Sequence, residues 1–118
     1  MKRWVVALSA GWAVLVVSAA GGSGKELFER RCTGCHALDR DKAGPRLGGV
    51  FGRRAASVTT FQYSDALRKS GVVWDRATLD KWLADPDSVA PDNDMPFRAT
   101  DEKERAAIIA YLKEISGK

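Results

Sequence analysis

The sequence predicts an all-α domain in which about four short helices are joined by long loops. Two segments, 75–85 and the stretch that starts near residue 100, carry apolar residues at helical spacing, and no segment shows a convincing strand-like alternation. Polar and acidic residues suited to helix starts occur at 23–26 and 101–102. Because long loops are unusual inside a compact domain, we expect these loops to wrap around a bound group.

The first helix is predicted to begin at Ser23. Ser23 and Glu26 fit a capping box, with the serine at the N-cap and the glutamate three residues on. This helix should run directly into Cys32. The segment that follows, 37–57, is rich in Gly and contains Pro45, so we expect an ordered loop there.

Three further helices complete the predicted domain. A short helix is expected over 64–70 and a longer one over 75–85, with Gly and Pro, respectively, directly after them. Residues 89–97 return to loop. The last helix should begin near Thr100, with Asp101 in its first turn, where a negative charge suits the helix dipole. Its apolar side comprises Ile108, Ile109, Tyr111, Leu112 and Ile115.

The N-terminal residues have the three parts of a secretory signal peptide. A short positive start precedes an almost wholly apolar run over 4–17, and small residues at 18–20 suit a signal peptidase. We therefore expect a signal peptide at 1–20 and one domain at 21–118. An uncleaved membrane anchor is the alternative, although the run is just short of the roughly 20 residues that span a bilayer.

Composition excludes some partners. Loss of Lys2 and Arg3 with the signal peptide lowers the net charge from +4 to +2. This charge is too small to indicate a nucleic-acid-binding protein, and no basic run extends beyond Arg53 and Arg54. We expect a monomer that meets a membrane only if the N-terminal segment is retained.

Cys32, Cys35 and His36 form a C-x-x-C-H motif, which is typical of covalent haem attachment. Two thiols at this spacing can add across the two vinyl groups of one haem. The histidine next to the second thiol is then held against the iron and becomes an axial ligand. The sequence therefore predicts one haem c per chain, bound through two thioethers.

Three other interpretations of the cysteines are weaker. A thioredoxin-type dithiol also uses C-x-x-C, but it leaves His36 unexplained and lacks a βαβ context. A structural zinc site usually needs four Cys or His ligands, and this chain has three such residues. A plain disulfide across a two-residue gap is unusual.

Met95 is the candidate for the sixth iron ligand. His36 is the only histidine in the chain, which excludes a second histidine ligand, and Met1 lies in the predicted signal peptide. Met95 lies among polar and turn residues in a Pro-rich loop, where a methionine is a poor choice as core filler. A thioether is a soft ligand, and His/Met ligation raises the reduction potential.

Beyond the haem motif, several stretches in this order and spacing resemble class I cytochromes c, in particular the mitochondrial-like bacterial branch. The resemblance covers residues 24–113, nearly all of the expected mature chain. The matching stretches are 24–28, 32–36, 44–53, 61–67, Trp74, 79–86, 95–97 and 110–113. This resemblance implies the cytochrome c fold, with loops wrapped around one covalently bound haem.

The resemblance also implies roles for individual residues near the haem. Pro45 matches a proline whose carbonyl accepts the free N–H of the ligating histidine, which fixes the orientation of the ring. Arg53, Tyr63 and Trp74 match residues that form hydrogen bonds to a buried haem propionate.

Three further positions concern the methionine side of the haem. Trp82 stands where the family has a tyrosine beside the axial methionine, and Asn93 stands where it has a threonine. Phe97 matches an aromatic residue that covers the haem face.

The resemblance also implies a crossing of the first and last helices, at Gly24, Phe28, Ile108 and Tyr111.

The implied function is electron transfer and not enzymatic catalysis. We expect a carrier that passes single electrons between redox partners, either membrane respiratory complexes or periplasmic oxidoreductases, in the periplasm or anchored to the periplasmic face of the inner membrane. A dedicated electron-transfer subunit of one periplasmic oxidoreductase is an alternative. A haem peroxidase or gas-binding protein is another, if Met95 is not a firm ligand.

The chain differs from the mitochondrial members in one respect. Where those members carry lysines around the haem edge, this chain has Asp87, Asp92 and Asp94.

Overall fold

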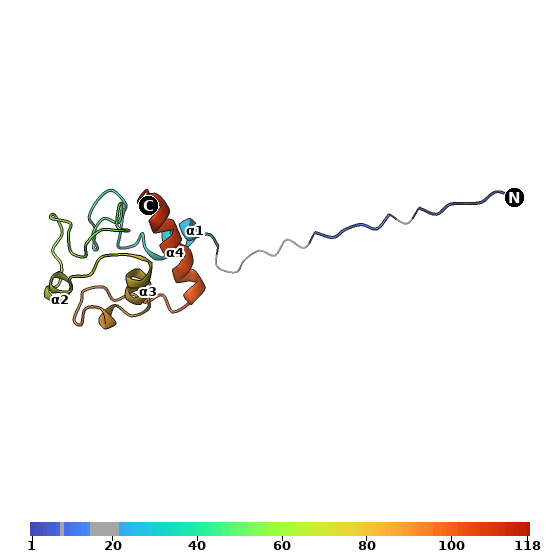
Figure 1. The fold of residues 1–118 in the computed structure, drawn as a ribbon. Coiled ribbons are helices and arrows are strands. Elements are labelled where there is room, and N and C mark those ends of the chain that lie inside the picture. The colour runs from blue at the N-terminus through green and yellow to red at the C-terminus, as the bar shows by residue number, and fades with distance from the viewer. Residues whose placement is uncertain (8, 15–21) are drawn as a thin grey trace.

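The computed structural model describes residues 1–7, 9–14 and 22–118 (Figure 1). The predicted all-α fold is confirmed. The helices are α1 (Gly24–Arg31), α2 (Asp65–Lys69), α3 (Arg76–Ala84), the short 3-10 helix η1 (Pro86–Ser88) and α4 (Glu102–Ile115). Within the described ranges, β pairing is limited to one isolated antiparallel bridge between Arg54 and Val73.

Side chains of polar residues fix where the helices begin. Ser23 is the N-cap of α1, and its hydroxyl accepts the Glu26 N–H at 3.2 Å, which is one half of the expected capping box. The reciprocal box occurs instead at α3, where Asp75 accepts the Thr78 N–H at 2.9 Å and the Thr78 hydroxyl accepts the Asp75 N–H at 2.8 Å.

One detail of the predicted helices is wrong. The last helix begins at Glu102, and Asp101 lies before its first turn and not in it. Asp101 is the N-cap because its carboxylate accepts the Glu104 N–H at 3.0 Å. Pro86 follows the end of α3, as expected, and it also opens η1, in which a proline suits the first position.

α1 and α4 cross at Gly24, as the resemblance implied. A Cβ atom at Gly24 would overlap the backbone carbonyl of Ala107, so only glycine allows this approach. Phe28 and Tyr111 pack beside the crossing with ring centroids 5.3 Å apart, and Ile108 is 1% exposed. The crossing of the first and last helices brings the two ends of the folded domain together (Figure 1). α4 also packs on α3.

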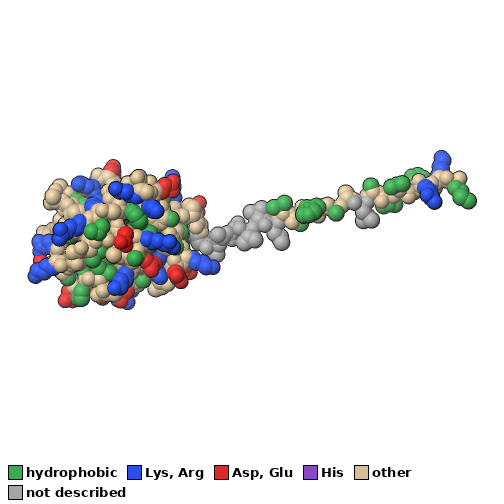
Figure 2. All heavy atoms as spheres, viewed as in Figure 1, with side chains coloured by type: hydrophobic (Ala, Val, Ile, Leu, Met, Phe, Trp, Pro, Cys, Tyr) green, Lys and Arg blue, Asp and Glu red, His purple; other side chains and the backbone are tan. Residues whose placement is uncertain are grey.

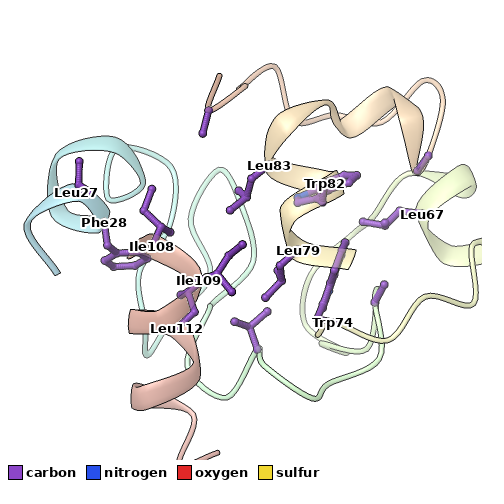
Figure 3. Close-up of a cluster of buried hydrophobic side chains, with 14 residues drawn as sticks. Leu27, Phe28, Leu67, Trp74, Leu79, Trp82, Leu83, Ile108, Ile109 and Leu112 are labelled. Carbon is purple, nitrogen blue, oxygen red and sulfur yellow. The ribbon is translucent and has the colours of Figure 1, made fainter. Parts of the chain in front are cut away.

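The buried side chains converge on the centre of the domain from three sides. Figure 3 shows Leu79 and Leu83 of α3 facing Ile109 and Leu112 of α4, while Trp74 and Trp82 lie at the far end of the cluster. Trp74 and Trp82 are in contact, with ring centroids 5.5 Å apart. All of these side chains except Ile109 line the cavity described below, so the core surrounds a space.

Asp41 connects two distant parts of the long segment 32–64 between α1 and α2. One carboxylate oxygen accepts the Arg46 N–H at 3.1 Å, and the other accepts the Thr60 hydroxyl at 2.6 Å. These bonds hold the pKa of Asp41 below its ordinary value, with the Thr60 hydroxyl as the largest cause. The two parts of this segment are therefore held together by a partly exposed charged group.

Residues 1–7 and 9–14 contain no helix or strand and extend away from the folded body (Figure 1). Trp4 and Trp12 are exposed, and Figure 2 shows apolar side chains along this segment. The rest of the predicted signal peptide, residue 8 and residues 15–20, lies outside the described residues, as does Gly21. In the described part of the chain, no helix is long and apolar enough to cross a membrane.

Substitution of Gly24 by alanine should destabilise the protein, because the added methyl group forces α1 and α4 apart. We expect a loss of about 1–3 kcal/mol in the free energy of unfolding, the usual range for overpacked sites. Guanidinium titration of the haem-loaded protein measures it. An unchanged free energy of unfolding would contradict a tight helix crossing.

Asp41→Asn should lower stability at neutral pH, and the deficit should vanish in acid. Because the folded-state pKa lies below the ordinary value of 3.8, ionised Asp41 stabilises the fold above that pH. This contribution is lost as the pH falls through the folded-state pKa. Denaturant midpoints at pH 7 and at successively lower pH would measure it. Asp39→Asn is the control, since Asp39 is exposed and contacts its neighbour Arg40 at 3.5 Å. A deficit that did not shrink with falling pH would refute the electrostatic role.

Candidate haem-binding site

A cavity of about 440 Å³ lies at the centre of the domain. Its volume is within the range of small-molecule and cofactor sites. All eleven candidate site residues of the sequence analysis line it: Cys32, Cys35, His36, Pro45, Arg53, Tyr63, Trp74, Trp82, Asn93, Met95 and Phe97. Cys32 and Met95, which are 63 positions apart in the sequence, therefore line the same cavity.

The C-x-x-C-H motif forms a tight turn directly after α1. The N–H of Cys32 donates to the Phe28 carbonyl at 2.8 Å, which continues the helical pattern. The N–H groups of Cys35 and His36 then both donate to the Cys32 carbonyl, at 3.2 and 2.9 Å. This turn brings both thiols and the imidazole to the cavity wall.

The polypeptide environment of the cysteines does not suit a redox dithiol. Burial raises the pKa of the Cys32 thiol to about 11, and Arg31 offsets only part of this shift. Reactive dithiols need the opposite shift, toward the thiolate. The zinc interpretation is also unsupported, because the described residues include no group of three or more Cys, His, Asp or Glu side chains placed to hold a metal.

His36 is oriented by the backbone of the next loop. Its Nδ1 lies 2.7 Å from the Pro45 carbonyl oxygen. Because a carbonyl can only accept, Nδ1 carries the proton and Nε2 keeps its lone pair for a metal. Burial lowers the pKa of His36, which favours the neutral imidazole that a metal requires.

Gly44 allows the loop to pass directly over the His36 ring. A Cβ atom at Gly44 would overlap the imidazole, and the backbone N–H of Gly44 donates to the Cys35 carbonyl at 2.7 Å. No role for Gly44 was predicted from the sequence. The sequence feature that could have pointed to this close contact is its position directly before Pro45.

Met95 lies on a different wall, in the loop between η1 and α4. Its backbone N–H donates to the Asn93 side-chain oxygen at 2.8 Å. The Asn93 side-chain nitrogen donates to the Ala90 carbonyl at 3.0 Å and to Asp87 at 2.9 Å. Asn93 therefore contacts the backbone that carries Met95, in addition to lining the cavity.

Arg53 and Tyr63 form a polar corner in a mostly apolar cavity. The two terminal nitrogens of Arg53 donate to the carbonyls of Gly48 and Arg46, at 3.2 and 3.0 Å, while its buried Nε has no partner among the described residues. The Tyr63 hydroxyl accepts the Val58 N–H at 3.2 Å, which does not use the hydroxyl hydrogen. Burial lowers the pKa of Arg53 and raises that of Tyr63.

This corner fits an acidic group. A buried donor without a partner costs free energy, and a carboxylate that enters the cavity would remove that cost. The other lining groups include two thiols, an imidazole nitrogen, a thioether and the polar side chains of Arg31, Ser64, Asn93 and Asp94. The rest of the wall is mostly apolar, and it includes eight side chains that were not predicted from the sequence: Leu47, Val50, Phe61, Leu67, Leu79, Leu83, Ile108 and Leu112. This set fits a large apolar ring system with a metal at its centre and carboxylates at its edge.

The sequence matches the family model described as Cytochrome c over residues 22–116. The chain is 45% identical over 87 residues to cytochrome c2 iso-2 of Magnetospirillum fulvum, covering 71% of this chain and 91% of the relative. It is 41% identical to cytochrome c type-1 of Ascaris suum, covering 78% and 85%.

Solved structures of similar fold agree with these sequence matches. Cytochrome cH from Methylobacterium extorquens aligns with a TM-score of 0.73 and 42% identity, covering 77% of this chain and 94% of that one. The ferricytochrome c2 from Rhodopseudomonas palustris aligns with a TM-score of 0.72 and 30% identity, covering 78% and 95%. The chain therefore belongs to the cytochrome c family, as a small class I electron-transfer protein that binds one haem c through cysteine thioethers.

Proposed function

We propose that this cytochrome is a one-electron carrier whose haem iron is bound by His36 and Met95. The observation that carries the proposal is that both side chains line the same cavity as the two cysteines. When bound, the haem supplies an iron that alternates between the ferric and ferrous states. If His36 and Met95 both held the iron, no position on it would be left for a substrate.

The residues around the two proposed ligands limit movement during electron transfer. Pro45 holds the His36 ring through its carbonyl, and Gly44 lets the loop close over that ring. Asn93 holds the backbone of Met95. Because neither ligand has to move when the charge of the iron changes, little reorganisation is needed for each transfer.

Arg53 and Tyr63 are proposed to bind a carboxylate of the haem, and Trp74 lies next to them on the cavity wall. A buried carboxylate is costly unless it is paired and hydrogen-bonded. The unpartnered Arg53 Nε and the Tyr63 hydroxyl hydrogen support this role. Trp82 and Phe97 would then supply apolar contacts to the ring system.

The proposed site of action is the periplasm, after removal of residues 1–20. The proposed partners are membrane respiratory complexes or periplasmic oxidoreductases. Lys/Arg and Asp/Glu side chains are interspersed on the face of the domain in Figure 2, which suits brief protein encounters better than nucleic-acid binding. Transient redox encounters use small interfaces, so a monomer that docks and releases is the expected form.

The intact mass of the native protein should equal a chain that starts near Gly21 plus one haem. The haem should stay bound through denaturation and acid–acetone extraction, because thioethers survive both. Fractionation should place this form in the periplasm. The double variant Cys32→Ser/Cys35→Ser is the control and should release its haem. Haem that extracts from the wild type would refute the attachment, whereas intact residues 4–20 in washed membranes would indicate an anchor.

Met95→Ala should remove the weak far-red absorption band expected of a ferric sulfur–iron bond. The reduction potential should fall by on the order of 0.1 V, since axial ligands vary haem potentials over about 0.8 V. The opened iron should bind carbon monoxide when reduced and gain peroxidase activity. Asp94→Asn, at the exposed neighbouring position, is the control and should keep the band. Rapid, tight carbon monoxide binding by the wild type would favour the enzyme or gas-binding alternative.

A further inference from the structure

The segment that carries Met95 separates the central cavity from solvent by a single layer of residues, here called the wall. Met95 lines the central cavity, and it also lines an open groove on the outside, together with Asp87, Asn93 and Arg98. Side chains that face both a cavity and solvent have few neighbours behind them. Polar contacts within the wall must therefore contribute to holding Met95 in place.

These polar contacts form a continuous path from one end of the loop to the other. Arg98, three residues after Met95, lies 3.4 Å from one oxygen of Asp87. The other Asp87 oxygen accepts a hydrogen bond from Asn93 at 2.9 Å, and Asn93 in turn accepts the Met95 N–H at 2.8 Å. Asp87 is therefore shared by both halves of the loop.

Two more contacts join the two ends of the loop, residues 83–85 and 98–99. Arg98 also lies 3.0 Å from Asp85, an ion pair by distance although its geometry does not give a hydrogen bond. The N–H of Ala99 donates to the Leu83 carbonyl at the end of α3, at 2.7 Å. The backbone contact anchors the end of the loop to the buried Leu83 of α3. The side-chain contacts are half exposed and can break without unfolding the core.

We propose that Arg98, Asp87 and Asn93 form a latch that positions Met95 against the cavity. Opening of the latch then sets how often the iron becomes accessible to outside ligands. The inference rests on the proposed function, in which Met95 is the sixth ligand. These three residues act through the loop and are positioning residues, because the role inferred here requires no contact with the iron.

The latch makes the loop's opening rate sensitive to charge. Exposed ion pairs contribute little to global stability, so their loss should leave the folded domain intact. The same loss should populate the open loop more, because the two loop halves are no longer joined through Asp87. Local opening and global unfolding should therefore respond differently to the same substitution.

The test is ligand exchange on the ferric, haem-loaded protein. Imidazole at saturating concentration replaces Met95 only as fast as the loop opens, and loss of the far-red band follows the exchange. Arg98→Gln and Asp87→Asn should each accelerate it about threefold to tenfold, the range expected for an exposed but networked ion pair. The double variant should exceed Arg98→Gln by less than twofold, because Arg98→Gln already removes the Arg98–Asp87 contact that Asp87→Asn breaks.

Arg68→Gln is the matched control, because Arg68 is an equally exposed arginine paired with Asp65 on α2, outside the loop. It should exchange at the wild-type rate. Guanidinium midpoints of all variants separate local opening from global unfolding. The latch would be refuted if imidazole exchange became faster only in proportion to a loss of the guanidinium midpoint. It would also be refuted if Arg68→Gln accelerated the exchange equally.

The outcomes distinguish the latch from the function on which it rests. If the wild type lacks the far-red band, Met95 is not the ligand and both proposals fail. If the wild type has the band but Arg98→Gln and Asp87→Asn exchange at its rate, the carrier assignment stands and the latch is refuted. Asp87→Asn preserves the shape of the side chain, so it reports on the contact even if Arg98→Gln folds poorly.

Discussion

The passage of the chain over the His36 ring is the constraint on which the rest of the site depends. The loop after the C-x-x-C-H turn returns so closely that only glycine fits at residue 44, and Pro45 then presents its carbonyl to Nδ1 at 2.7 Å. This return fixes the orientation of the imidazole on one wall of the cavity. Side chains of α3, α4 and the Met95 loop form other walls, so a haem held by His36 would have to fit between them.

The two sides of the cavity are held by different means. On the histidine side, the covalent motif, a backbone carbonyl and the close glycine contact leave little freedom. On the methionine side, Asn93 and exposed ion pairs hold a thin loop. Because exposed ion pairs are weak, the methionine side is the side expected to open. Under the proposed ligation by Met95, the strength of that loop bears directly on electron transfer.

Arg53 brings a charged group to the wall of the cavity. Its terminal nitrogens are satisfied by backbone carbonyls, and its buried Nε is left for an incoming acceptor. Asp41 holds together the two parts of segment 32–64 that contribute Arg53 and Tyr63. The polar corner thus depends on loop packing rather than on any helix.

The sequence alone determined the helices, the haem and the attachment turn, because these depend on local spacing: caps before helices, and two thiols and a histidine within five residues. It also left Met95 as the one methionine beyond the signal segment, and that ligation stays a prediction. Only the tertiary structure decided that Gly44 lies on His36, that Asp41 reaches Thr60, and that Arg98 closes on Asp87. Such contacts join residues through loops, and their partners include backbone atoms that every residue possesses. No side-chain pattern marks them, so their positions follow only from how the whole chain packs around the cavity.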